Sequence, residues 1–384
     1  MKLAFDCMAA SCEDYRHLAE RRLPRFLFDY IDGGAGDEHT LVANCRDFQR
    51  LHLRQRVLCD VEGPDTRCEL IGQAASMPLA LAPLGMAGLY AWRGEVQAAR
   101  AAATAGVPFA LSTVGICPLA EVHAASAQPC WFQLYMLRDR EAVLGLLQQA
   151  RANGCDTLLF TVDLPVAGIR RRDIRNGMLD GSWRGKLAKA AQLAQRPGWL
   201  LDVGMRGKPH HFGNLADQVA NPNDLRAFKA WLDAQFDPRV TWRDILWLRE
   251  QWKGKLILKG ILEPHDALQA LDSGADGIVL SNHGGRQLDG VASSIRQLPA
   301  VARALDQRLP ILLDGGIRSG VDILKALALG AQGVMIGRPW AWALAAGGEA
   351  AVARLLASLQ RELAVAMALS GVNSLEKISD NLVG

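Results

Sequence analysis

Short apolar runs alternate with helical stretches in a regular order from Met77 onward, and this alternation limits the fold more than any other feature. The helical stretches include Arg93 to Ala105, Asp139 to Ala152 and Val321 to Leu329. Strands that alternate with helices in this way predict a parallel sheet. The eight predicted strands are 78–84, 108–113, 130–135, 157–163, 255–260, 277–282, 310–314 and 333–337.

Eight strand–helix units within about 260 residues have the size and number of a closed (β/α)8 barrel, the TIM barrel. An open doubly wound sheet is the alternative, but no G-x-G-x-x-G follows any strand with an acidic residue about 20 positions later. We therefore predict a single domain over residues 1–384, with a helical segment at 1–76 and the barrel at 77–384. Glycines suited to a left-handed cap end several helical stretches: Gly106, Gly154, Gly274 and Gly330.

The fourth unit is irregular, because residues of about 164–240 separate its strand from the next helical pattern. A segment this long is predicted to be an insertion at the C-terminal end of the strand. Its residues 170–215 contain ten Lys or Arg and three Asp. Five large apolar residues lie among them: Trp183, Trp199, Leu200, Leu201 and Phe212. This composition suits a contact with an anionic membrane surface, and it equally suits a lid whose tryptophans pack on the barrel.

Charge and cysteine usage exclude several classes of function. The chain has 43 basic and 40 acidic residues, which is too balanced for a nucleic-acid-binding surface over the whole protein. All eight cysteines lie in the first 155 residues, without a C-x-x-C pair and without grouping with histidines. We therefore predict no metal site and expect reduced thiols. No stretch reads as a transmembrane helix.

Polar side chains stand at the predicted C-terminal ends of the strands, which is where a barrel of this kind builds its active site. In strand order, these ends carry Ala82-Pro83-Leu84, Ser112, Gln133 with Tyr135, Thr161 with Asp163, Lys259, Ser281 with His283, Asp314-Gly315-Gly316 with Arg318, and Gly337-Arg338. Eight such ends that converge on one face favour an active site over a purely structural barrel.

The sixth of these ends is the strongest candidate for chemistry. His283 stands on a glycine-rich turn, three residues before Arg286. A titratable base beside a fixed positive charge suits removal of a proton next to a carboxylate, whereas the alternative is a capped turn whose histidine bonds a backbone carbonyl. Asp163, two strands away, is a candidate acceptor for a hydrogen bond from the imidazole. Lys259 is predicted to point into the barrel mouth, either as a Schiff-base amine or as a charge that stabilises a bound cofactor.

Two glycine-containing turns follow the seventh and eighth strands, where barrel enzymes commonly bind phosphate through backbone N–H groups. Gly315-Gly316 forms one turn, and Gly337-Arg338 adds a guanidinium to the other. Either pair alone fits an ordinary turn with a solvated arginine. Together with their positions, they favour a phosphorylated ligand.

The block Ser281-Asn282-His283-Gly284-Gly285-Arg286-Gln287-Leu288-Asp289-Gly290 resembles the signature of the FMN-dependent α-hydroxy-acid oxidizing enzymes. Other motifs of that family recur in order: Leu23-Pro24 to Gly34-Ala35, Ala82-Pro83, Trp131-Phe132-Gln133-Leu134-Tyr135, Thr161-Val162-Asp163, Lys259-Gly260 and Asp314-Gly315-Gly316-Ile317-Arg318. The resemblance extends from Asp14 to about Ser374. Within the family, the chain most resembles the bacterial quinone-linked L-lactate dehydrogenases.

The resemblance implies a role for each matching residue. His283 would be the base, oriented by Asp163, and Lys259 would lie near the N1 edge of the flavin. The substrate carboxylate would be bound by Arg286 and Arg170, with hydroxyl groups from Tyr30 and Tyr135. Three arginines follow one another here, and Arg170 is chosen because it stands nine residues after Thr161. FMN would be held by Ala82, Pro83, Leu84, Ser112, Gln133, Thr161, Lys259 and Ser281, and its ribityl phosphate by Asp314, Gly315, Gly316, Arg318, Gly337 and Arg338.

The reaction that the resemblance implies is oxidation of L-lactate to pyruvate, with electrons passing through FMN to a membrane quinone. Gly85 supports a quinone acceptor, because family members that use oxygen often have alanine there. Mandelate or glycolate as substrate, an FMN-dependent isomerase on the same barrel and a non-catalytic binding barrel are the alternatives. We expect a homotetramer at the cytoplasmic face of the inner membrane, bound peripherally through about 170–215, with a soluble cytoplasmic protein as the alternative.

Overall fold

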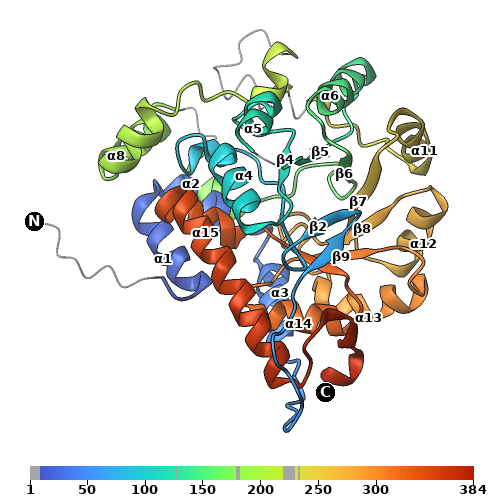
Figure 1. Ribbon diagram of the computed structural model, residues 1–384. Helices are drawn as coiled ribbons and strands as arrows, with labels where there is room; N and C mark the ends of the chain where they lie inside the picture. The colour runs from blue at the N-terminus through green and yellow to red at the C-terminus, as the bar shows by residue number, and fades with distance from the viewer. Residues whose placement is uncertain (1–8, 127, 179–181, 219–229, 232–233) are drawn as a thin grey trace, which may run out of the picture.

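A closed barrel of eight parallel strands forms the centre of the computed structural model, as predicted (Figure 1). The structure describes residues 9–384 except 127, 179–181, 219–229 and 232–233. The strands are β3 (Leu79–Leu81), β4 (Ala110–Ser112), β5 (Trp131–Leu134), β6 (Thr157–Thr161), β7 (Lys255–Ile261), β8 (Gly277–Leu280), β9 (Ile311–Asp314) and β10 (Gly333–Ile336). They pair in the order β3-β10-β9-β8-β7-β6-β5-β4, and a parallel bridge between Leu81 and Phe109 closes the ring.

One side chain from each strand fills the barrel interior. The eight residues are Ala80, Ala110, Trp131, Leu159, Ile257, Val279, Leu312 and Met335, all of them buried. Because side chains alternate along a strand, the residues on either side of each face the helices instead. Leu158 and Phe160 of β6 accordingly belong to the larger apolar cluster outside the barrel. The near-continuous apolar runs in the sequence therefore reflect strands that are buried on both faces.

A ring of helices surrounds the strands in Figure 1. They are α4 (Gly94–Ala105), α5 (Leu119–Ala125), α6 (Arg140–Ala152), α11 (Trp242–Gln251), α12 (Pro264–Asp272), α13 (Ser294–Leu305), α14 (Gly320–Ala328) and α15 (Arg338–Leu369). The four predicted cap glycines all have positive φ, between +69° at Gly106 and +105° at Gly330, which confirms the prediction. Short 3-10 turns complete the described part of the chain at η1 (Ala87–Leu89), η4 (Leu375–Lys377) and η5 (Asp380–Leu382).

The N-terminal segment is less uniformly helical than predicted. It forms α1 (Cys12–Arg22), α2 (Arg25–Asp32) and α3 (His39–Gln49), followed by the antiparallel hairpin of β1 (Cys68–Leu70) and β2 (Gln73–Ala75). α1 and α2 are separate because Pro24 has no N–H to donate to the preceding turn. Leu70 and Ala75 of the hairpin pack on the interior layer, so the hairpin closes the end of the barrel where the strands begin.

The insertion lies between β6 and α11, as predicted. Among its described residues are α7 (Arg171–Arg175), α8 (Trp183–Ala194), α9 (Pro197–Trp199), the π-helical turn η2 (Leu200–Met205) and the 3-10 turn η3 (Gly213–Gln218). Trp199 is buried, and its indole N–H donates to the carbonyl of Leu89 at 2.8 Å. Trp183, Leu187 and Leu201, in contrast, are 70%, 63% and 59% exposed. The segment therefore packs on the barrel and also presents apolar side chains to the outside.

Candidate functional site

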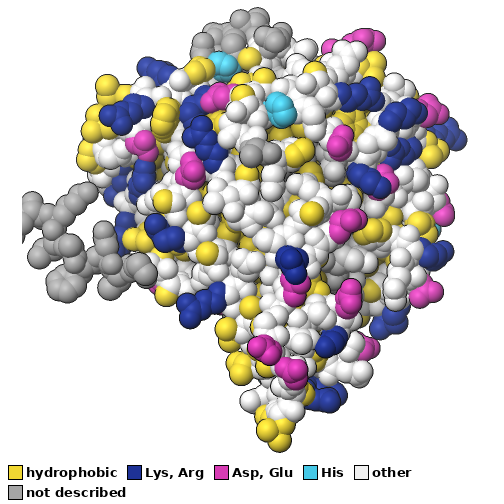
Figure 2. Space-filling model, viewed as in Figure 1, with side chains coloured by type: hydrophobic (Ala, Val, Ile, Leu, Met, Phe, Trp, Pro, Cys, Tyr) yellow, Lys and Arg dark blue, Asp and Glu magenta, His cyan; other side chains and the backbone are white. Residues whose placement is uncertain are grey.

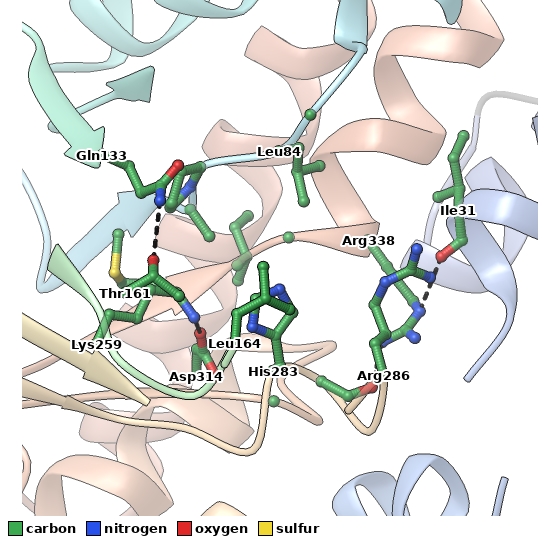
Figure 3. A pocket seen from close by; sticks show the side chains of 18 of the residues that line it. Ile31, Leu84, Gln133, Thr161, Leu164, Lys259, His283, Arg286, Asp314 and Arg338 are labelled. Atoms are coloured by element: carbon green, nitrogen blue, oxygen red, sulfur yellow. Dashed lines mark hydrogen bonds and ion pairs between the residues drawn. The ribbon is translucent and has the colours of Figure 1, made fainter. Parts of the chain in front are cut away.

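A cavity opens at the C-terminal ends of the strands and contains about 1070 Å³ of space not filled by atoms. All but three of the predicted site residues line it. The exceptions are Asp163, Ser112 and Ser281, each of which contacts a lining residue from behind. Figure 3 shows Gln133, Thr161, Lys259 and Asp314 on one side of the cavity, Arg286 and Arg338 on the other, and His283 between them.

His283 is held in an uncommon backbone conformation, with φ of +57°, and is followed by Gly284 and Gly285 with φ of +62° and +74°. Non-glycine residues rarely adopt positive φ, and such strain concentrates at functional sites. The backbone N–H of His283 donates to Ser281 Oγ at 3.0 Å, which fixes the first step of the turn. These left-handed residues reverse the chain after β8, and His283 lines the cavity.

Asp163 orients the imidazole. Its Oδ1 lies 2.9 Å from His283 Nδ1, and its Oδ2 is buried without a hydrogen-bond partner. Burial raises the pKa of Asp163, but the charge that His283 carries when protonated, the hydrogen bond with His283 and the charge of Lys259 outweigh burial and hold the pKa below its usual range. An ionised carboxylate only accepts hydrogen bonds, so Nδ1 carries a proton. Nε2 is therefore the nitrogen of His283 that is left to act as a base.

Lys259 is buried between two polar strand ends. Its Nζ lies 2.7 Å from Asp314 Oδ2 and donates to Ser281 Oγ at 3.1 Å. Burial lowers the pKa of Lys259, but Asp314 and Asp163 outweigh burial and raise the pKa above its usual value. A lysine that stays protonated is a poor amine nucleophile. Of the two roles left open by the sequence, the structure therefore favours a fixed positive charge over a Schiff base.

Two arginines enclose the ring of Tyr30. The guanidinium carbons of Arg170 and Arg286 lie 5.6 Å and 4.9 Å from the ring centroid. Arg286 also donates from Nη1 to the carbonyls of Tyr30, at 2.6 Å, and Gly33, at 2.8 Å. Of the three successive arginines, Arg170 is the one that lines the cavity, whereas Arg171 and Arg172 form ion pairs with the N-terminal segment. This placement agrees with the position chosen by counting from Thr161.

The cavity is electrostatically suited to anions. Burial, followed by the charge of Arg170, lowers the pKa of Arg286. Burial, followed by the charges of Arg286 and Arg318, lowers the pKa of Arg338. A lowered arginine pKa means that buried positive charge is not fully balanced by nearby carboxylates. A bound phosphate or carboxylate would supply the missing negative charge.

Arg338 differs from the expectation in one respect. Its guanidinium donates to the carbonyls of Ile31, Gly33 and Gly284 at 3.1, 2.9 and 2.9 Å. These three hydrogen bonds all go to the backbone, and the side chain therefore joins the N-terminal segment to the turn after β8. It still brings positive charge to the cavity, and as the first residue of α15 it leaves free backbone N–H groups at a helix N-terminus.

The donors and acceptors around the cavity fit FMN. Asp314 lines the cavity and its buried Oδ1 has no hydrogen-bond partner, so it can accept from a ligand hydroxyl such as those of a ribityl chain. Gln133 Nε2 donates to Thr161 Oγ1 at 3.0 Å, and Ser112 Oγ donates to Gln133 Oε1 at 3.1 Å, which fixes a polar edge for a heteroaromatic ring. The α15 N-terminus, with Gly316 and Arg318 on the neighbouring turn, suits the phosphate.

Several lining residues were missed by sequence reasoning, because it considered polar side chains at strand ends. Val114, Leu164 and Met335 are apolar members of the wall, and Tyr90 donates its hydroxyl to the carbonyl of Gly85 at 3.0 Å. The side-chain amide of Asn44, in α3, donates to Asn282 Oδ1 at 2.9 Å, and that of Asn282 donates to Asn44 Oδ1 at 2.7 Å. These two hydrogen bonds attach the turn that carries His283 to helix α3. Nothing in the spacing of these residues along the chain indicates their proximity.

Comparisons with known proteins agree with the geometry. A family model described as FMN-dependent dehydrogenase matches residues 19–384. An L-lactate dehydrogenase of Caulobacter sp. (strain K31) is 54% identical over 374 residues, which cover 97% of this chain and 98% of that protein. An L-lactate dehydrogenase of Chromohalobacter salexigens is 52% identical over 371 residues, covering 96% of this chain and 94% of that protein.

Solved structures are similar over the same extent. The crystal structure of the monotopic membrane protein (S)-mandelate dehydrogenase matches with a TM-score of 0.92 and 35% identity, covering 98% of this chain and 99% of that chain. A mandelate oxidase with (S)-4-hydroxymandelic acid matches with a TM-score of 0.84 and 36% identity, covering 98% of both chains.

Proposed function

Because this chain belongs to the FMN-dependent dehydrogenase family, we propose that it oxidises L-lactate to pyruvate and passes the electrons to a quinone. The observation that carries the proposal is that His283, paired with Asp163, lines one cavity with Arg170, Arg286 and Tyr30. This set supplies a base and a carboxylate-binding group in the same cavity. More than half of the residues are identical to those of a protein named L-lactate dehydrogenase.

In the proposed reaction, Arg286 and Arg170 bind the substrate carboxylate, and Tyr30 and Tyr135 offer hydroxyl groups. Burial raises the pKa of Tyr135, so its hydroxyl stays protonated and can donate. Bound FMN supplies a two-electron acceptor, and Lys259 supplies a fixed positive charge at the end of β7. The other cavity residues proposed for FMN are those at the ends of β3, β5, β6, β9 and β10.

His283 Nε2 accepts the proton in either of two routes. It removes the α-proton of the substrate, or it removes the hydroxyl proton as a hydride leaves the α-carbon. In both routes the imidazole becomes a cation, and the ionised Asp163 stabilises that cation through Nδ1–H. The pair therefore does the same work in both routes.

A peripheral membrane contact through about 170–215 accompanies the proposed quinone acceptor. Exposed Trp183, Leu187 and Leu201 lie in a segment rich in Lys and Arg, and Figure 2 shows hydrophobic and basic side chains together at the edge where α8 lies. The similar (S)-mandelate dehydrogenase is described as a monotopic membrane protein. In the part of the chain that the structure describes, no helix is both long and apolar enough to cross a bilayer.

Gly85 leaves little room for the alanine that the family resemblance associates with oxygen as the acceptor. A Cβ at this position would stand 2.8 Å from Val114 Cγ2. Alanine would therefore require the wall of the cavity to move. Whether the acceptor is a quinone or oxygen is measured by turnover with a short-chain ubiquinone analogue and with air. The homo-oligomer, which we propose to be a tetramer, is measured by light scattering.

The test of the reaction is anaerobic bleaching of the flavin by L-lactate, compared with glycolate and (S)-mandelate. His283→Gln is expected to retain FMN and to lower the rate of flavin reduction by at least about 10²-fold, because a general base is removed. A variant that keeps more than a few per cent of the rate would show that His283 is not the base. An isomerase would leave the flavin oxidised at the end of turnover, and so would a non-catalytic barrel.

A further inference from the structure

Residues 30–38, the end of α2 and the turn to α3, carry Tyr30 to the cavity and are bound by arginines from three separate parts of the chain. They are called the α2–α3 turn below. Arg286 and Arg338 donate to its carbonyls, as described above. The third is Arg172, which reaches the carboxylates of the same turn rather than its carbonyls. Its Nη1 lies 2.8 Å from Asp32 Oδ2, and its Nη2 lies 2.5 Å from Glu38 Oε2.

Both carboxylates are themselves part of the turn geometry. Glu38 Oε1 accepts from the backbone N–H of Gly34 at 2.9 Å, so Arg172 braces a carboxylate that already closes the turn. Asp32 is 5% exposed and also accepts from Arg16 at 2.6 and 3.0 Å. Burial raises the pKa of Asp32, but the hydrogen bonds from Arg16 and Arg172 outweigh burial, and the pKa lies below its usual range. The Asp32 carboxylate is therefore charged near neutral pH.

The aliphatic part of the Arg172 side chain also fixes the spacing between the insertion and the α2–α3 turn. A Cβ at Gly33 would stand 3.3 Å from Arg172 Cδ and 2.7 Å from the carbonyl oxygen of Asp29, so the arginine lies against the bare backbone of the turn. A backbone hydrogen bond from Gly36 N–H to the carbonyl of Ile169, at 3.0 Å, joins the same two segments. Arg172 is thus two residues from Arg170 and in contact with the turn that holds Tyr30.

We infer that Arg172 is a positioning residue for carboxylate binding: by bridging Asp32 and Glu38, it sets the spacing between Arg170 and the Tyr30–Arg286 pair. The inference rests on the proposed function, which assigns the substrate carboxylate to these three side chains. Arg170 stacks on Tyr30 from the insertion, and Arg286 stacks on it from the barrel. A shift of the turn relative to Arg170 changes the distance between Arg170 and the Tyr30–Arg286 pair, and a bound carboxylate must contact both. Misplacement by about 1 Å is enough to weaken such a site strongly.

The chain offers a matched control in the neighbouring Arg171. It forms an ion pair with Asp37, and the two side chains are 49% and 60% exposed. Exposed pairs of this kind contribute little. Arg171→Ala therefore removes an arginine side chain from a solvent-exposed ion pair. Arg172→Ala, one position further along the chain, removes the arginine side chain that bridges Asp32 and Glu38.

The experiment titrates pyruvate into the oxidised holoenzyme by calorimetry, which requires no turnover. Arg172→Ala is expected to raise the Kd for pyruvate by about tenfold and the KM for L-lactate similarly, with kcat within about threefold. Arg171→Ala is expected to match the unsubstituted protein. Arg172→Lys keeps the charge, but an ammonium group cannot bridge two carboxylates as the planar guanidinium does. The Kd of this variant for pyruvate should therefore lie between those of the unsubstituted protein and Arg172→Ala. FMN content and the thermal midpoint are read separately for every variant.

Glu38→Gln supplies a second, milder variant and a double-mutant cycle. If Arg172 acts through Glu38, the effects of Glu38→Gln and Arg172→Ala on the Kd are less than additive. Unchanged pyruvate binding in Arg172→Ala, or fully additive effects in the double variant, would overturn the inference while leaving the proposed function intact. An unsubstituted holoenzyme that neither binds pyruvate nor is bleached by L-lactate would overturn both.

Discussion

At the scale of single residues, the chemistry depends on which nitrogen of His283 is free. Asp163 accepts from Nδ1 at 2.9 Å, and its side chain is 14% exposed. The carboxylate thus selects the tautomer before any substrate arrives, and the positive φ of His283 gives the turn that brings the residue to the cavity wall. Neither property is visible in the residue type. The tautomer follows from the contact with Asp163, and the turn follows from the three left-handed residues that begin at His283.

The pairing has a consequence for stability at acidic pH. Because the pKa of Asp163 is lowered in the folded state, the stabilisation is present above the unfolded carboxyl pKa of about 4 and is lost as pH falls through the lower folded value. We predict that the difference in free energy of unfolding between the unsubstituted protein and Asp163→Asn shrinks as the pH falls below about 4. Denaturant titrations at and below this pH measure the difference. A difference that persists undiminished well below about pH 4 would contradict the assignment.

The residue types predicted which side chains lie at the site, but they did not predict all of the groups that these side chains contact. Lys259 was expected at the barrel mouth, and the structure adds its ion pair with Asp314. Arg338 was expected at a phosphate, yet its guanidinium is directed to the carbonyls of Ile31, Gly33 and Gly284. The contacts with Ile31 and Gly33 join residues about 300 positions apart. A single sequence carries no information on such distant pairs, so their partners could not be predicted.

At the scale of elements, the insertion has two different faces. Trp199 and Val203 are buried against the barrel, whereas Trp183 and Leu187 of α8 and Leu201 of η2 are exposed. A tryptophan pattern alone could not separate the lid from the membrane contact, because both use the same residue types. The structure shows that some of these residues are buried against the barrel and that others are exposed.

We predict that the triple variant Trp183→Asp, Leu187→Asp and Leu201→Asp abolishes most binding to anionic vesicles. Each carboxylate opposes both the insertion of an apolar side chain and the attraction of the basic segment to anionic lipid. Flavin reduction by L-lactate should stay within about twofold, since these residues are remote from the cavity lining. Vesicle co-sedimentation is the measurement. Val57→Asp, which also replaces an exposed apolar residue, is the control, and equal sedimentation of all three proteins would argue against the contact.

Elements with strong periodicity or clear end signals were predicted, and short ones were not. All eight barrel strands and the cap glycines follow from apolar runs and helix-terminating glycines. The β1–β2 hairpin has two strands of three residues each, which is too short for an alternating pattern to emerge. One apolar pattern continues through α1 and α2, so periodicity alone does not divide them. The division follows from Pro24, which has no backbone N–H to donate.

At the scale of the whole molecule, the barrel has a chemical end and a structural end. The cavity lies where the strands finish, and the β1–β2 hairpin covers the opposite end, where Leu70 packs on the interior layer. Eight interior side chains fill the space between the two ends, so the two ends are joined by packed side chains rather than by a channel.

This division predicts that stability and substrate binding can be changed separately. Leu70→Ala should lower the free energy of unfolding by about 2–5 kcal/mol, because Leu70 is 1% exposed and its removal leaves a cavity beneath the hairpin. The KM for L-lactate should be unchanged. Denaturant titration and steady-state kinetics test the two halves, and a KM shift of more than about threefold would show that the ends are coupled.

The hydrogen bonds of Arg338 also bear on the order in which the site matures during synthesis. Tyr30 lies near the start of the chain, but the turn that follows it is bound by Arg286 and by Arg338, the first residue of the last long helix. A ribosome-bound chain that has exposed the first four barrel strands, β3 to β6, and the residues just after them already contains Tyr30 and Asp163, but not Arg286 and His283, which contact them. We therefore expect competence to bind substrate only after β10, the eighth barrel strand, and Arg338 have emerged and the barrel can close.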